Sequence, residues 1–128
     1  MLLNKLHHVA VICSDYEKSK NFYVNILGLS ILKETYRSER NSYKLDLMVG
    51  GEYQIELFSF PNPPERITSP EARGLRHLAF EVDDIEIAIK YLSFHNIETE
   101  KIRIDELTGK KYTFFRDPDM LPLELYEK

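Results

Sequence analysis

Two histidines and two glutamates occupy matching places in the two halves of the 128-residue chain. His8 opens the run His-Val-Ala-Val and His77 opens His-Leu-Ala-Phe, so each half carries a His-x-Ala-x element. Glu56 and Glu124 each lie inside a short apolar run. The histidines are 69 positions apart and the glutamates 68, as expected for a duplicated module that lost one residue. These four side chains, two in each half, are of the types that bind metal ions, and their matching placement predicts one shared metal site.

The chemistry of the four side chains favours a divalent cation. An ionised carboxylate inside an apolar strand loses much of its hydration and needs a compensating partner. A divalent ion bound by Glu56, Glu124 and the neutral rings of His8 and His77 would supply one, because first-row metals accept imidazole nitrogen and carboxylate oxygen. Taken singly, each residue also fits a core or surface position. The mixed set without thiolates is typical of a catalytic site with open water positions.

The first half is predicted to contain a strand, a helix and three further strands. Asp15 offers a helix N-cap, Gly28 a C-terminal stop, and Gly50-Gly51 a hairpin turn. The expected ranges are 5–13 for the first strand, 15–28 for the helix, and 30–37, 43–49 and 53–60 for the later strands.

The second half repeats this order. Asp83 or Asp84 can cap its helix, and Asn96 can end it in the left-handed conformation. The expected ranges are 75–82 for the first strand, 84–96 for the helix, and 98–104, 111–116 and 121–127 for the later strands. The fold class is therefore α+β with two βαβββ modules, whose sheets are expected to pack or join around a common axis.

The chain is expected to form one domain with two modules and a connecting loop. The first module covers about 4–60 and the second about 74–128, and the loop of about 61–73 is rich in proline, which cannot continue a sheet. Ligands from both modules would then converge where the modules meet.

Strand alternation predicts which side chains share a face. Glu124 and Tyr126 should point away from the helix-packed face of the last strand. Glu56 should do the same in its strand, with Tyr53 on the opposite face. His8 and His7 should also face opposite ways. Neither His7 nor His95, in the last turn of the second helix, is assigned a ligand role.

Composition bounds the choice of partners and compartment. The net charge is −4, the pI is about 5.6, and no basic run exceeds Lys110-Lys111, which argues against nucleic acid and favours a small-molecule partner. No stretch approaches the roughly 20 apolar residues of a membrane span, and no secretory segment is evident, so a cytoplasmic protein is expected. The single cysteine, Cys13, is expected to be a buried, inert thiol.

These motifs resemble the vicinal oxygen chelate superfamily in its glyoxalase I-like branch, over nearly the whole chain. The residues that carry the resemblance are His8-Val9-Ala10-Val11, Asp15-Tyr16, Phe22-Tyr23, Leu27-Gly28, Ile55-Glu56-Leu57, His77-Leu78-Ala79-Phe80, Val82-Asp83-Asp84, Asp117-Pro118-Asp119 and Leu123-Glu124-Leu125.

The resemblance implies a curved mixed sheet built from paired βαβββ modules around a divalent metal held by His8, Glu56, His77 and Glu124. Nickel or zinc is the first expectation, with manganese, cobalt or iron as alternatives. A homodimer is expected, with the site formed within one chain or between two. The implied activity is that of a lyase or isomerase of the glyoxalase I type, acting on a small oxygenated metabolite such as a thiol hemithioacetal, with Glu124 as the base and Glu56 as its partner carboxylate.

Other functions within the resemblance stay open. They are a metal-dependent epimerase, a thiol transferase of the fosfomycin-resistance kind, and a small-molecule-binding module without turnover; the length and the fourth ligand argue against an extradiol dioxygenase. Glyoxalase I enzymes that use glutathione place Arg and Asn where this chain has Ile12 and Phe60. Five arginines either hold an anionic substrate or are surface charges: Arg37, Arg40, Arg66, Arg73 and Arg76.

Overall fold

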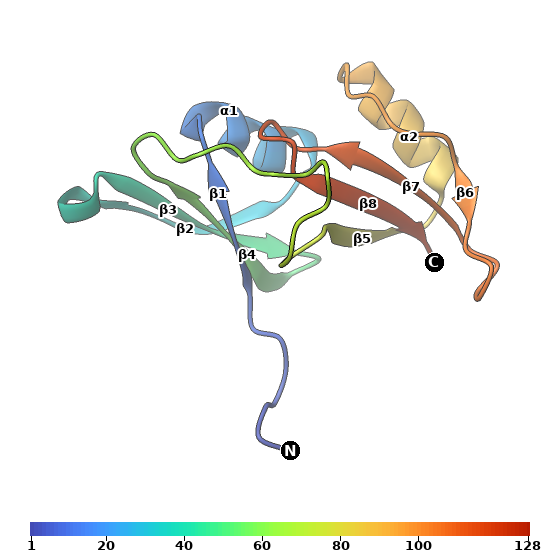
Figure 1. Ribbon diagram of the computed structural model, residues 1–128, viewed down its shortest axis with the longest axis horizontal. Helices are drawn as coiled ribbons and strands as arrows, with labels where there is room; N and C mark the ends of the chain where they lie inside the picture. The colour runs from blue at the N-terminus through green and yellow to red at the C-terminus, as the bar shows by residue number, and fades with distance from the viewer. The chain divides into compact units, whose positions relative to one another are not determined.

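The computed structural model describes all residues, 1–128, and the chain divides into two compact units, Met1–Pro64 and Glu65–Lys128. Each unit contains a strand, a helical segment and three strands in that order, which confirms the predicted α+β class and the βαβββ repeat (Figure 1). Each unit forms its own four-stranded mixed sheet, in which the first and last strands are parallel neighbours.

The first unit has the strand order β1-β4-β3-β2. The later strands agree with the predicted ranges to within one residue, whereas the single predicted helix is divided into an α-helix and a π-helical segment. The elements are β1 (Val9–Cys13), α1 (Tyr16–Lys20), the π-helix η1 (Asn21–Ile26), β2 (Ser30–Arg37), the 3-10 turn η2 (Ser38–Arg40), β3 (Ser42–Val49) and β4 (Glu52–Ser59).

The predicted helix N-cap and hairpin turn of the first unit are confirmed. The Asp15 carboxylate accepts a hydrogen bond from the backbone N–H of Lys18 at 3.1 Å and so caps α1. Gly50 and Gly51 have φ angles of 59° and 86°, the positive values that a two-residue hairpin turn between β3 and β4 requires.

The second unit has the strand order β5-β8-β7-β6. The predicted strand over 98–104 is wrong for most of its length, because only its last two residues pair with β7. Upstream of them the chain is held irregularly: the Glu100 N–H donates to the Phe114 carbonyl at 2.8 Å, and the Thr113 hydroxyl donates to the Glu100 carbonyl at 2.7 Å. The elements are β5 (Leu78–Val82), α2 (Ile85–Phe94), β6 (Arg103–Ile104), β7 (Lys111–Arg116) and β8 (Pro122–Glu127).

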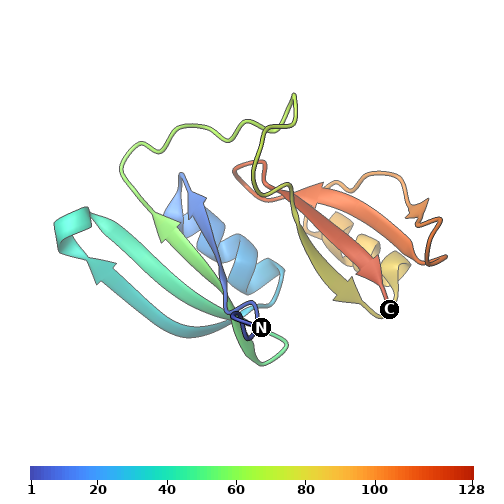
Figure 2. The ribbon, with the colours of Figure 1, turned by 60° about the horizontal axis from the view of Figure 1, so that its bottom comes forward.

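Each unit has an apolar core between its helical segment and one face of its own sheet (Figure 2). Phe22 and Tyr23 are buried in the first unit, as are Ile85 and Leu92 in the second. Cys13 is also buried, with its thiol donating to a backbone carbonyl at 3.3 Å, which confirms the expected buried thiol. The opposite face of each sheet is left for the candidate site.

None of the helices has the length and apolar character needed to cross a membrane.

The cap of α2 allows a test of the fold. The Asp84 carboxylate accepts hydrogen bonds from the backbone N–H groups of Glu86 at 3.0 Å and Ile87 at 3.1 Å. Replacing Asp84 with Ala should lower the free energy of unfolding by about 1 kcal/mol, because both donors lose their partner. The matched change Asp83→Ala should have a smaller effect, since Asp84 makes the cap. Urea unfolding of both variants checks this, and equal losses would contradict the assignment.

Candidate metal centre

The first unit brings His8 and Glu56 together. In the parallel register of β1 and β4, Ala10 lies beside Glu56. The small Ala10 side chain leaves space over the carboxylate, and His8, two residues earlier, occupies it. His8 Nε2 lies 3.4 Å from Glu56 Oε2, and Glu56 is only 7% exposed. A buried carboxylate and a histidine nitrogen therefore face one another at the start of β1.

The second unit repeats this arrangement with His77 and Glu124. Ala79 lies beside Glu124 in the register of β5 and β8. His77 Nε2 lies 2.8 Å from Glu124 Oε2, and Glu124 is 9% exposed. The other ring nitrogen of His77, Nδ1, is buried without a hydrogen-bond partner. In each unit, one of the two predicted histidines thus lies beside one of the two predicted glutamates.

The two pairs have the chemistry and spacing of metal ligands. Two atoms that each lie about 2.1 Å from one ion are roughly 3.0 to 3.4 Å apart at octahedral or tetrahedral angles. The observed separations of 3.4 Å and 2.8 Å are close to that range. In neither unit does a third His, Cys, Asp or Glu complete a metal-binding group. Each unit therefore brings together two of the four side chains predicted as ligands.

Glu56 is also held by a polar neighbourhood that sequence reasoning missed. The Tyr53 hydroxyl donates a short hydrogen bond to the Glu56 carboxylate. Lys44 Nζ lies 2.8 Å from Asp46 Oδ1 and 3.7 Å from Glu56 Oε2. The hydrogen bond to Asp46 raises the pKa of Lys44 above its usual value, with the charge of Glu56 adding to the effect, so a lysine cation compensates both carboxylates. Asp46, buried in the apolar run of β3, was the signal available in the sequence.

The prediction that Tyr53 and Glu56 lie on opposite faces of β4 is wrong. The β3–β4 register passes from Leu47 opposite Ile55 to Met48 opposite Tyr53, which leaves Gln54 as an extra residue in β4. Such a bulge reverses the alternation of side chains beyond it. Tyr53 is thereby turned toward Glu56.

The prediction that His7 and His8 face opposite ways is also wrong. His7 Nδ1 lies 2.9 Å from His8 Nδ1, and the His7 ring meets the Tyr53 ring edge-on at 5.4 Å. Strand alternation does not extend to His7, because β1 begins only at Val9. His7 therefore packs beside the His8–Glu56 pair, whereas His95 lies at the C-terminal cap of α2 against Tyr91.

Glu124 has a less polar environment than Glu56. Phe114 of β7 lies directly opposite Glu124 in the antiparallel register, at the place that Asp46 occupies beside Glu56. The His77 ring meets the Phe114 ring edge-on at 5.2 Å. The two carboxylates are thus distinguished: Glu56 is anchored by a tyrosine and a lysine, and Glu124 contacts a histidine beside an aromatic ring.

Comparison with known proteins identifies the family to which the chain belongs. The family model for the Glyoxalase/Bleomycin resistance protein/Dioxygenase superfamily matches residues 5–125. The chain belongs to this superfamily. The resemblance drawn from its motifs is thereby confirmed.

Relatives within the superfamily cover the chain at several levels of identity. YwkD of Bacillus subtilis (strain 168) is 65% identical over 128 residues, with all of both chains covered. The metallothiol transferase FosB of Staphylococcus saprophyticus is 30% identical, with 98% of this chain and 78% of FosB covered. The crystal structure of a glyoxalase family protein from Enterococcus faecalis has a TM-score of 0.90 and 52% identity, covering 99% of this chain and 100% of that one. Other relatives carry the names of a glyoxylase I and of epimerases.

Proposed function

We propose that this chain is a cytoplasmic, divalent-metal-dependent lyase or isomerase of the glyoxalase I type, acting on a small oxygenated metabolite such as a thiol hemithioacetal. The observation that carries the proposal is the matched pair of buried carboxylates, each beside a histidine nitrogen, in two units of the same topology. Burial of Glu124 without a cation would be costly, whereas Glu56 already has Lys44 at 3.7 Å as a partner. His8, Glu56, His77 and Glu124 together would hold one ion, with nickel or zinc expected first.

The site would be completed within one chain or between two chains of a homodimer. Each unit supplies only two ligands, so a four-ligand site needs both pairs. Bound there, the ion supplies positive charge that stabilises negative charge developing on the substrate oxygens.

The two glutamates would then have different tasks. Glu124 takes a proton from one substrate carbon and returns it to the neighbouring carbon, which converts a hemithioacetal into the isomeric hydroxy thioester without net gain or loss of atoms. Glu124 lies opposite Phe114 of β7 and beside His77, at the edge of the space that the substrate would occupy. Glu56, held by Tyr53 and compensated by Lys44, stays in place as a ligand.

A direct test uses methylglyoxal mixed with a small thiol, glutathione or cysteine, and follows the thioester by its ultraviolet absorbance and by chromatography that separates it from the hemithioacetal of equal mass. Protein stripped with a chelator should be inactive, and reloading with nickel or zinc should restore formation of the thioester. Recovery of unchanged starting material with every metal would contradict this activity and favour a binding module.

Transfer of a thiol is the second candidate, because FosB is 30% identical over nearly the whole chain. A transferase joins the thiol to an electrophilic substrate, so its product has the combined mass of both reactants and a new carbon–sulfur bond. Offering the same metal-loaded protein an epoxide and the thiol, and finding that adduct in place of the isomer, would favour this candidate.

A further inference from the structure

A positively charged cavity lies in the second unit, beside His77. Its volume is about 330 Å³, and its wall is formed by the segment around Arg66 to Arg76 together with residues of β6 and β7. Four arginines line it against two glutamates, an excess of two positive charges in a chain whose net charge is −4. A concentration of like charge around a cavity needs an explanation, because it opposes folding unless anions compensate it.

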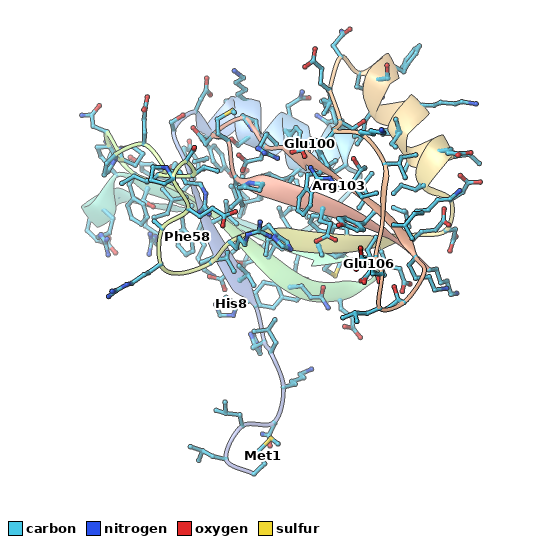
Figure 3. The ribbon with its side chains drawn as sticks, turned by 45° about the vertical axis from the view of Figure 1, so that its right-hand side comes forward. Met1, His8, Phe58, Glu100, Arg103 and Glu106 are labelled. Carbon is cyan, nitrogen blue, oxygen red and sulfur yellow. The ribbon has the colours of Figure 1, made fainter.

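Two of these arginines share a single carboxylate. Arg103 Nη2 lies 2.7 Å from Glu100 Oε1 (Figure 3). Arg116 Nη2 lies 3.1 Å from Glu100 Oε2. Arg116 is fixed further by a hydrogen bond from Nη1 to the Phe115 carbonyl at 3.1 Å. One Glu100 charge therefore compensates two guanidinium groups, so one positive charge is left over.

Arg66 supplies the second uncompensated charge. Its Nη2 donates to the carbonyl oxygens of Leu75 at 2.7 Å and Arg76 at 3.3 Å, which fixes its position without neutralising its charge. The fourth arginine, Arg76, pairs with Glu71 at 2.8 Å. Two guanidinium charges of the wall are therefore positioned by hydrogen bonds but unmatched by carboxylates.

The cavity adjoins the candidate metal centre through Phe114. The Arg103 guanidinium lies 5.8 Å from the centre of the Phe114 ring, and the His77 ring meets the same ring edge-on. Phe114 and Arg116 alternate on β7 and share the face on which Glu124 lies opposite Phe114. An anion between the arginines would therefore sit next to the His77–Glu124 pair.

We propose that this cavity binds an oxyanionic group of the substrate, a carboxylate or a phosphoryl group, through Arg66, Arg103 and Arg116, and presents the adjoining part of that molecule to His77 and Glu124. The second part of this inference, the presentation of the bound molecule to His77 and Glu124, rests on the proposed function. The inference names organic anions as the substrate class. Guanidinium groups suit this ligand because their N–H donors match the oxygen spacing of carboxylate and phosphate. In the absence of the anion, the Glu100 carboxylate pairs with Arg103 and Arg116. Replacing these ion pairs with contacts to the anion costs little free energy, because exposed ion pairs are weak.

The test is titration calorimetry on the full chain with two probes, inorganic phosphate and succinate, first as purified and again after chelator treatment, so that binding to a metal is separated from binding to the arginines. Saturable binding of either probe in both forms is expected, and the tighter probe distinguishes a phosphoryl from a carboxylate source. Arg103→Gln should weaken binding at least about tenfold by removing a charge-assisted contact. Arg40→Gln, which changes an arginine of the first unit, should leave it unchanged.

Glu100→Gln gives the sharpest outcome, because it should tighten binding by removing the competing carboxylate, and a folding defect would not produce a gain. Absence of saturable binding to both probes, or equal affinities in wild type, Arg103→Gln and Glu100→Gln, would overturn the proposal. The outcome is separable from the proposed function: anion binding without hemithioacetal conversion supports the cavity and opposes the isomerase, and conversion without anion binding does the reverse.

Discussion

Replacing Glu124 with Gln is expected to lower turnover of the hemithioacetal at least about a hundredfold while the chain stays folded. The amide has nearly the shape of the carboxylate and can still fill the space beside His77, but it cannot accept the substrate proton. Because Glu124 lies opposite Phe114, no neighbouring carboxylate on β7 can replace it. The measurement is the steady-state rate at saturating metal, with circular dichroism and thermal unfolding to verify the fold.

Two further variants serve as controls for the Glu124→Gln measurement. Glu81→Gln alters an exposed glutamate of the neighbouring strand β5 and should leave turnover unchanged. Glu56→Gln should retain more turnover than Glu124→Gln at saturating metal, because Glu56 is assigned to holding the ion. Unchanged turnover in Glu124→Gln would remove this residue from the mechanism, and a larger loss in Glu56→Gln would exchange the two roles.

His8→Ala and His77→Ala are each expected to remove most of the bound metal, although they alter different units. Loss of an outer-shell partner of a metal ligand already costs roughly 10- to 100-fold in affinity, and loss of a ligand itself should cost at least the upper end of that range. A shared ion explains why either change empties the site. Affinity measured by competition with a chromogenic chelator, on dialysed protein, gives the comparison.

His95→Ala is the matched control for the two histidine variants. His95 lies at the C-terminal cap of α2 and contacts Tyr91, so its removal should leave metal affinity at the wild-type value. If one of the two ligand variants kept wild-type affinity, its unit would contribute no ligand and the shared site would be contradicted.

The parts of the site that follow from local pattern could be predicted from the sequence. Duplication, helix caps and the turn at Gly50-Gly51 depend on residues close together in the chain, and they fixed the order of elements in both units. The sequence also indicated His8, Glu56, His77 and Glu124 as one set, but which histidine lies beside which glutamate depends on the parallel registers of β1 with β4 and of β5 with β8.

What could not be predicted depends on register and on contacts distant in sequence. A bulge at Gln54 turned Tyr53 toward Glu56, and no pattern in the β4 sequence marks one extra residue in a ladder. The strand expected over 98–104 was lost to irregular bonds between Glu100 and β7. Those same contacts position Glu100 between Arg103 and Arg116, so the charge pattern of the cavity emerges only in the folded unit.

The difference between the two glutamates has the same origin. Both occupy equivalent positions in the repeat, and nothing near them in sequence distinguishes the proposed ligand from the proposed base. The distinction comes from the neighbouring strand: Asp46 with Lys44 lies beside Glu56, whereas Phe114 lies beside Glu124. The repeat thus places equal carboxylates at matching positions, and different residues on the adjacent strands give them unequal surroundings.

The measurement that tests the central claim most directly is the metal content of the wild-type chain, determined by elemental analysis on protein purified without chelators or an affinity tag and then reconstituted. Four ligands around a shared ion predict about one divalent ion per chain, whether the ligands come from one chain or two. No bound metal after reconstitution, or about two ions per chain with one at each His–Glu pair, would contradict the shared centre.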